Sequence, residues 1–299
     1  RLQVDGGEMS RARALAVVLA LALGLAGAAG AATREELTKA VDAYRAQLRA
    51  QPNSAELHAA LGETLESLGD TAGAMAEYER GLRGTGDTHR ALIDRGQLFV
   101  RQGRFDDGRK DFNRALGQNS RDVEALTARG HSWVAEGKNK KAPAAFADFN
   151  EALSISPNDG AALNARGSFY LAQLKPELAI KDFDKALAAT PNDDVLLYNR
   201  GMAWKQLSHY DRALRDFNAA LRITPGDPMT LAAKGDAYRQ LGDLLLAREF
   251  YDAAIKADPQ SAIAWQARGE IRTALGDSAG GDADKAQAHK LNPAVESLS

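Results

Sequence analysis

Apolar positions along most of this chain follow the spacing of amphipathic helices. Between residues 160 and 193, Leu163, Gly167 and Tyr170 lie three or four residues apart and therefore share one helix face. A second apolar stripe begins after Pro176, which can open a helix because its missing N–H would be unpaired there anyway. Pro191 ends this stripe, since proline cannot continue a helix. The pattern predicts two helices joined by a turn.

The same pattern returns at a fixed period. A glycine recurs at intervals of 34 residues, with one interval of 37, at Gly62, Gly96, Gly130, Gly167, Gly201, Gly235 and Gly269. Self-similarity at one period is typical of stacked repeats, so we expect an all-α solenoid of seven helix-turn-helix repeats. The predicted repeats are 55–88, 89–122, 123–159, 160–193, 194–227, 228–261 and 262–295. Their first helices are expected near 55–68, 89–102, 123–136, 160–174, 194–207, 228–241 and 262–275.

Three further positions keep this period. An aromatic residue follows the glycine by three positions at Phe99, Trp133, Tyr170, Trp204 and Tyr238. The second helix carries alanine and, four residues later, an aromatic residue at Ala74/Tyr78, Ala145/Phe149, Ala179/Phe183, Ala213/Phe217 and Ala247/Tyr251. This signature resembles the tetratricopeptide repeat. The resemblance implies a right-handed α-solenoid whose concave groove, lined by the first helices, binds a partner.

The two ends of the predicted solenoid depart from the pattern. Residues 33–52 contain Ala40 and Tyr44 in phase and are interpreted as an N-terminal capping helix. In the last repeat Gly281 and Lys285 replace the alanine and the aromatic residue, which is typical of a solvent-tolerant end repeat. Residues 296–299 form a short tail. The third repeat has extra length in a basic turn, 137–143, for which a solvated turn and a contact with an anionic partner are both open.

The first 32 residues have a different character. Basic residues precede an apolar run from Ala14 to Ala32, and Ala29, Gly30 and Ala31 fit a signal-peptidase cleavage site. Residues 1–31 are therefore predicted to be a signal peptide, with residues 1–8 lying upstream of the true start. Cleavage would leave a periplasmic or secreted protein that meets the membrane only transiently through this signal. The alternative is an uncleaved anchor in the inner membrane.

Composition argues against several kinds of chemistry. The chain has no cysteine, which excludes disulfides and thiolate metal ligands, and its net charge of −2 lacks the basic excess that nucleic-acid binding requires. The five histidines are scattered without the spacing of a metal site, and no phosphate-binding loop or nucleophile elbow is present. We therefore expect no catalytic residue, cofactor, metal or nucleic-acid partner, and predict that the protein is not an enzyme.

A charged pair also keeps the period. Five repeats have arginine directly before the glycine and aspartate directly before the second-helix aromatic position, at Arg95/Asp111, Arg129/Asp148, Arg166/Asp182, Arg200/Asp216 and Arg268/Asp284. Because the two residues occur together, we interpret them as ion pairs that join the two helices. The alternative is a ladder of arginines for a polyanion. The sixth repeat has Lys234 and Phe250 at these positions.

The resemblance also implies which residues face a partner. In the family, the groove positions lie at fixed distances from the periodic glycine. At the same distances this chain has the predicted groove residues Asn164, Ser168, Leu171, Val195, Tyr198, Met202, Lys205, Met229, Asp236 and Arg239. Apolar side chains among them predict a contact site in the fourth to sixth repeats, and Lys205 and Arg239 favour an acidic partner. The alternative is that these side chains pack repeat against repeat.

The predicted function is an exported scaffold or adaptor that binds a protein or peptide partner in this groove. Two alternatives are open: an envelope-assembly factor that binds glycan or lipid, and a non-catalytic subunit of an enzyme complex.

Overall fold

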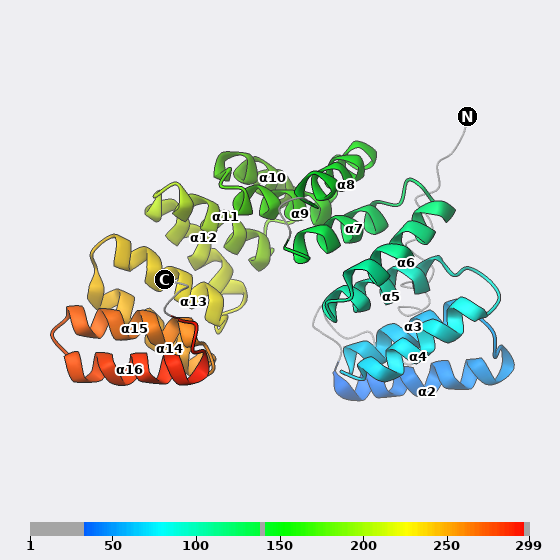
Figure 1. The fold of residues 1–299 in the computed structure, drawn as a ribbon, viewed down its shortest axis with the longest axis horizontal. Coiled ribbons are helices and arrows are strands. Elements are labelled where there is room, and N and C mark those ends of the chain that lie inside the picture. Colours follow the sequence, from blue (N-terminus) through cyan, green and yellow to red (C-terminus); the bar gives the residue numbers. More distant parts are fainter. Residues whose placement is uncertain (1–32, 138–140, 296–299) are drawn as a thin grey trace. The chain divides into compact units, whose positions relative to one another are not determined.

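The computed structural model describes residues 33–137 and 141–295. These residues hold fifteen α-helices and no strand, apart from an isolated β-bridge between Ser54 and Thr85. Numbered as in Figure 1, the helices are α2 (Arg34–Ala50), α3 (Ala55–Ser67), α4 (Thr71–Arg83), α5 (His89–Arg101), α6 (Phe105–Gln118), α7 (Val123–Ala135), α8 (Ala142–Ile155), α9 (Gly160–Ala172), α10 (Pro176–Ala189), α11 (Asp194–Gln206), α12 (Tyr210–Ile223), α13 (Pro228–Gln240), α14 (Leu244–Ala257), α15 (Ala262–Ala274) and α16 (Ser278–Leu291). The all-α prediction is confirmed, and the first helix of each repeat begins at the residue predicted for it.

The chain forms two compact units, the first ending at Ile155 and the second beginning at Ser156. In the first unit α3 packs on α4, α5 on α6 and α7 on α8, while α2 packs on α3. In the second unit the pairs are α9 with α10, α11 with α12, α13 with α14 and α15 with α16 (Figure 1). Within each unit the second helix of one pair also contacts the first helix of the next, so each unit is a stack of helix-turn-helix repeats.

Side-chain caps mark the start of six of the seven first helices; the exception is α5, where Thr88 makes no side-chain cap hydrogen bond. Asp159, Asp193 and Asp227 each accept the backbone N–H three residues on, which satisfies one of the unpaired amides at a helix start. Helix α2 begins with a capping box between Thr33 and Glu36 and buries Tyr44 in one apolar cluster with side chains of α3 and α4. Local sequence therefore sets the helix boundaries, and contacts with neighbours stabilise the helices.

The periodic glycine permits close contact between the two helices of a repeat. A Cβ atom added at Gly201 would lie 2.5 Å from Cε1 of Phe217, whose side chain is fully buried. The corresponding approach in the sixth repeat is looser, because a Cβ at Gly235 would meet Tyr251 at 3.1 Å. Among the repeats with an aromatic ring at this seam, the glycine is therefore needed in all but the sixth, because a Cβ at Gly62 would clash with Tyr78 as well.

The turn inside each repeat requires a left-handed residue seven positions after the periodic glycine. Glycine supplies it in five repeats, with positive φ at Gly69, Gly103, Gly137, Gly242 and Gly276. The fourth and fifth repeats instead place Leu174 at φ 54° and Ser208 at φ 59°. A side chain with a Cβ atom adopts this conformation at a cost of about 1–2 kcal/mol. These two turns are therefore strained relative to the others.

The predicted arginine–aspartate pairs are present, each with two nitrogen–oxygen contacts of 2.6 to 3.0 Å. Each ion pair joins the two helices of its repeat. In four of the repeats the aspartate is buried and directly precedes a buried aromatic residue, as Asp216 precedes Phe217. Arg200 also reaches back to Asp184 of the preceding repeat at 2.8 Å, so it links two repeats as well as two helices. The guanidinium groups are occupied by carboxylates, which removes the basis of the polyanion alternative.

The sixth repeat replaces the ion pair with a cation–π contact. Nζ of Lys234 lies 3.9 Å from the centroid of the Phe250 ring, and this ring stacks on Tyr238 at 5.4 Å between centroids. Burial lowers the pKa of Lys234, as expected for an ammonium group held among rings. Two different chemistries thus perform one structural task at equivalent positions.

Three predicted segments fall partly or wholly outside the described residues. The predicted signal peptide, residues 1–31, lies outside them, as do residues 138–140 of the basic turn and the tail 296–299. Lys141, the described lysine of that turn, lies with Nζ 4.7 Å from the Trp133 ring centroid. Part of the basic turn therefore packs on the third repeat.

Candidate partner-binding surface

The most exposed apolar side chains on the first helices of the second unit share one phase. Val195, Met229 and Ile263 lie six residues before their glycines, at the second residue of α11, α13 and α15, and are 54%, 63% and 62% exposed. We call these three residues the apolar row. Val195 and Met229 were predicted from the sequence, whereas Ile263 was missed because the predicted site ended in the sixth repeat. The 34-residue period was the signal that would have found it.

Two other predicted site residues point toward the interior. Tyr198 and Met202 pack against a buried cluster of Ala213, Phe217 and Ala233. The rings of Tyr198 and Phe217 lie 6.1 Å apart, and burial, with the nearby charges of Asp227 and Asp236, raises the pKa of the Tyr198 hydroxyl. The cluster combines Ala213 and Phe217 of the same repeat with Ala233 of the next repeat.

Three predicted residues of the fourth repeat are half-buried. Asn164 accepts a hydrogen bond of 2.8 Å from the side-chain amide of Asn199, which joins α9 to α11. Ser168 and Leu171 lie further along α9, where the backbone oxygen of Leu171 accepts from Gln206 at 3.5 Å. These polar contacts hold neighbouring first helices in register and leave only part of each side chain accessible.

The predicted charged residues Lys205, Asp236 and Arg239 form a ladder of alternating sign with Glu270, which was not predicted; these four residues are called the charge ladder. Nζ of Lys205 lies 2.8 Å from Asp236, Arg239 lies 3.6 Å from Asp236, and Arg239 lies 3.1 Å from Glu270. The hydroxyl of Tyr251 also donates to Asp236 at 2.5 Å. Because Lys205 and Arg239 are each paired with a carboxylate, the charge ladder is neutral and offers little attraction to an acidic partner.

The first unit uses the same positions differently. Six residues before their glycines stand Glu56, Arg90 and Glu124, and Arg90 donates to Glu124 at 3.0 Å. Arg90 also contacts Asp94 at 2.8 Å, and burial raises the pKa of that carboxyl to about 7, although Arg90 opposes the shift. Ionic contacts between repeats therefore replace the apolar row in the first unit.

A histidine links helix α5 to the N-cap of helix α7. Nε2 of His89, at the start of α5, lies 2.6 Å from a carboxylate oxygen of Asp122, which caps α7. This hydrogen bond, opposed by burial, raises the pKa of His89. Burial works against ionisation of Asp122, yet the His89 contact and the cap amide together lower the pKa of Asp122. The pair is therefore stabilised in its ionised form.

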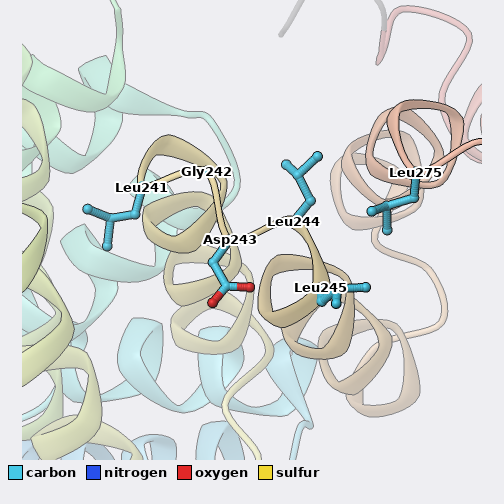
Figure 2. A pocket seen from close by; sticks show the side chains of 6 residues that line it. All are labelled: Leu241, Gly242, Asp243, Leu244, Leu245 and Leu275. Carbon is cyan, nitrogen blue, oxygen red and sulfur yellow. The ribbon is translucent and has the colours of Figure 1, made fainter.

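Leucines gather at the turns of the last two repeats. An open hollow of about 510 Å³ is lined by Leu241, Gly242, Asp243, Leu244, Leu245 and Leu275. Figure 2 shows Leu244, Leu245 and Leu275 on one side of the turn, whereas Leu241 points away from them. Its one charged side chain, Asp243, caps α14. The hollow does not enclose a ligand in the way that small-molecule sites do.

No three His, Cys, Asp or Glu side chains in residues 33–137 and 141–295 gather closely enough to hold a metal ion. Among the helices of these same residues, none combines the length and the apolar character that a membrane span requires.

The comparisons define the class of the protein. The family model described as the tetratricopeptide repeat matches residues 25–87, 93–159, 164–228, 198–262 and 232–286. The chain therefore belongs to the tetratricopeptide repeat family. No curated protein sequence matches it.

Solved structures share the fold at low sequence identity. A tetratricopeptide repeat protein from Parabacteroides merdae is 20% identical, with a TM-score of 0.62 over 86% of this chain and 97% of its own. PilW, a type IV pilus biogenesis factor, is 19% identical, with a TM-score of 0.64 over 72% of this chain and 99% of its own. The Cut9–Hcn1 structure of the APC/C is 16% identical, with a TM-score of 0.72 over 88% of this chain and 53% of its own. At these identities the likeness concerns the fold alone.

Proposed function

We propose that the protein is an exported scaffold that holds a protein or peptide partner against the first helices of its fourth to sixth repeats. Proteins of this fold are suited to protein–protein interaction because stacked repeats present an extended surface. The observation that carries the proposal is the exposure of Val195 and Met229 at equivalent positions of neighbouring repeats. Apolar side chains gathered on an accessible face are typical of interaction sites.

The remaining predicted residues have supporting roles in this proposal. Tyr198 and Met202 pack beneath the surface and fix the positions of α11 and α13. Lys205, Asp236, Arg239 and Glu270 form a neutral, ion-paired wall beside the partner. Asn164, Ser168 and Leu171 extend the surface along α9. The partner would therefore gain most of its binding energy from Val195 and Met229, whose side chains can still lose contact with water.

Export rests on the sequence of the first 31 residues. Basic residues, an apolar run and a small-residue cleavage site are together typical of a secretory signal. N-terminal sequencing of protein made in a bacterial host with an envelope tests this: we expect the chain to begin near Ala32. A product that retains Met9 and fractionates with the inner membrane would instead be an anchored protein.

Partner binding is tested by adding charge to the proposed contact surface. The double variant Val195→Asp, Met229→Asp should lose the proteins that co-purify with the tagged chain from an envelope fraction. The control is Leu245→Asp, since Leu245 is 62% exposed but lies at the turn of the sixth repeat. Equal losses in both variants, or none in either, would contradict the proposal.

The two alternative functions give different results in the same preparations. Sedimentation with purified envelope glycan or lipid vesicles that depends on Val195 and Met229 would favour the envelope-assembly factor. Enzyme activity that co-purifies with the tagged chain would favour the accessory subunit.

A further inference from the structure

We infer that the apolar row accepts an extended, cationic peptide segment that carries an apolar side chain at every third residue. This inference rests on the proposed function and gives the partner a chemical class. It concerns Val195, Met229 and Ile263 together with the loops beside them, and it extends the contact surface into the seventh repeat.

The spacing of the row indicates the period of the partner. Helix α11 contacts α13, α13 and α15 both pack against α14, and directly packed helices lie about 8–10 Å apart. Residues in the same phase on neighbouring first helices are therefore separated by about the same distance. A polyproline II segment returns to the same face after three residues, with a rise of about 9 Å. A β-strand returns after two residues and about 7 Å, which does not match the row.

The width of the row favours an extended chain over a helix. An amphipathic helix presents an apolar stripe at least about 100° wide and needs a correspondingly wide surface. Here the next position inward on each helix is already used: Tyr198 packs in the core, Ala232 packs against two buried clusters, and Gln266 donates to Glu270 at 3.1 Å. One line of accessible apolar side chains remains, which fits one face of a narrow segment.

Charge beside the row indicates the rest of the partner. The loops at 156–160, 190–194, 224–228 and 258–262 contain five aspartates and no lysine or arginine. We call these aspartates the aspartate rim: Asp159, Asp193, Asp194, Asp227 and Asp258. None of the five, all within the described residues, forms an ion pair with a lysine or arginine; their contacts are to backbone amides and to the hydroxyls of Thr224 and Thr230.

The rim lies directly beside the row along the chain. Asp193 and Asp194 precede Val195, and Asp227 stands two residues before Met229. The nearest basic residues in the same stretch are Arg222 and Lys256, three residues before Pro225 and Pro259, so carboxylates remain in excess. Since the charge ladder on the other side is neutral, the net field at the row is negative. A segment with lysine or arginine between its apolar residues complements this field.

The test uses defined peptides and the whole chain. The probe is a fluorescein-labelled peptide of roughly twelve residues that repeats Leu-Lys-Pro, since proline holds the extended conformation. One control repeats Leu-Glu-Pro, and a second has the probe's composition with its leucines adjacent. Fluorescence anisotropy at low salt should give a Kd for the probe at least about tenfold lower than for either control.

Variants then locate the binding. Met229→Ser and Ile263→Ser should each weaken probe binding at least about threefold, whereas Leu245→Ser should leave it within about twofold. Asp193→Asn with Asp227→Asn should also weaken it at least about threefold, because asparagine keeps the helix caps but removes the charge. Unchanged urea midpoints show that each variant is folded.

Three comparative results would overturn the inference, and so would a fourth result, the absence of binding by all three peptides. The comparative results are equal or tighter binding of the glutamate peptide, equal binding of the peptide with adjacent leucines, and an equal effect of Leu245→Ser. None of these results contradicts the proposed function, which is tested separately by co-purification with the Val195→Asp, Met229→Asp variant.

Discussion

Arg200 offers an internal comparison of a buried and an exposed ion pair. Its Nε and Nη2 atoms donate to the two oxygens of Asp216 at 2.8 and 2.7 Å, while Nη1 donates to Asp184 at 2.8 Å. The Asp216 side chain is 9% exposed and that of Asp184 is 54% exposed. The hydrogen bonds with Asp216 are the strongest of the contacts that raise the pKa of Arg200. Asp216→Ala and Asp184→Ala therefore remove carboxylates from one arginine in two environments.

The expected costs differ because burial differs. Loss of one partner from a fully buried pair costs about 3–5 kcal/mol. After Asp216→Ala, Arg200 still has Asp184 and partial access to water, so we expect a loss of about 2 kcal/mol in unfolding free energy. Exposed ion pairs contribute about 0–1 kcal/mol, so Asp184→Ala should cost about 0.5 kcal/mol or less.

Urea unfolding followed by circular dichroism measures both values, and amide hydrogen exchange shows whether the loss is concentrated in α11 and α12. Asp182→Ala should behave like Asp216→Ala, because Asp182 forms the equivalent pair with Arg166. If Asp184→Ala proved as costly as Asp216→Ala, the account of these pairs as buried links between helices would be wrong.

Three further predictions concern single positions. Gly201→Ala should destabilise by about 1–2 kcal/mol because the added methyl group overpacks a buried ring, whereas Gly235→Ala should be close to neutral in urea unfolding. Leu174→Gly should stabilise by about 0.5–1 kcal/mol in the same assay, since glycine adopts the observed positive φ without strain. The raised pKa of His89 means that its ion pair with Asp122 is fully stabilising below the unfolded-state pKa and is lost as pH rises through the folded-state pKa. The stability advantage of the wild type over His89→Gln should therefore shrink as the pH rises above about 6.5, the ordinary pKa of histidine.

Opposite results would identify the error in each case. Equal costs at Gly201 and Gly235 would show that the glycine does not act through helix spacing. Destabilisation by Leu174→Gly would mean that the leucine contributes more through packing than it loses through strain. A wild-type advantage over His89→Gln that grows with pH would contradict the ionised pair.

The repeat period made most of the fold predictable. The starts of the first helices follow from the repeat period, and the ion pairs follow from the joint occurrence of arginine and aspartate. The position of a residue within the repeat could not by itself show how deeply its side chain is buried. Tyr198 and Val195 are neighbours on one helix, yet Tyr198 packs against Phe217 while Val195 is exposed.

Contacts between repeats were the least predictable part of the site. The partner of Lys205 is Asp236, 31 residues away, and the partner of Arg239 is Glu270. Pairing of this kind depends on how neighbouring repeats stack, which a pattern within one repeat does not encode. It changes the expected partner, because the two cations that favoured an acidic ligand are neutralised within the protein.

The most direct test of the central claim is site-specific photo-crosslinking in cells, with a photoreactive amino acid placed singly at positions 195, 229, 263 and 245. The first three lie on the apolar row and the fourth on the turn of the sixth repeat, and Met229 and Leu245 are almost equally exposed, at 63% and 62%. The account predicts that the same partner is crosslinked from 195, 229 and 263 and not from 245. Crosslinking from 245 alone, or no adduct from the row, would contradict it.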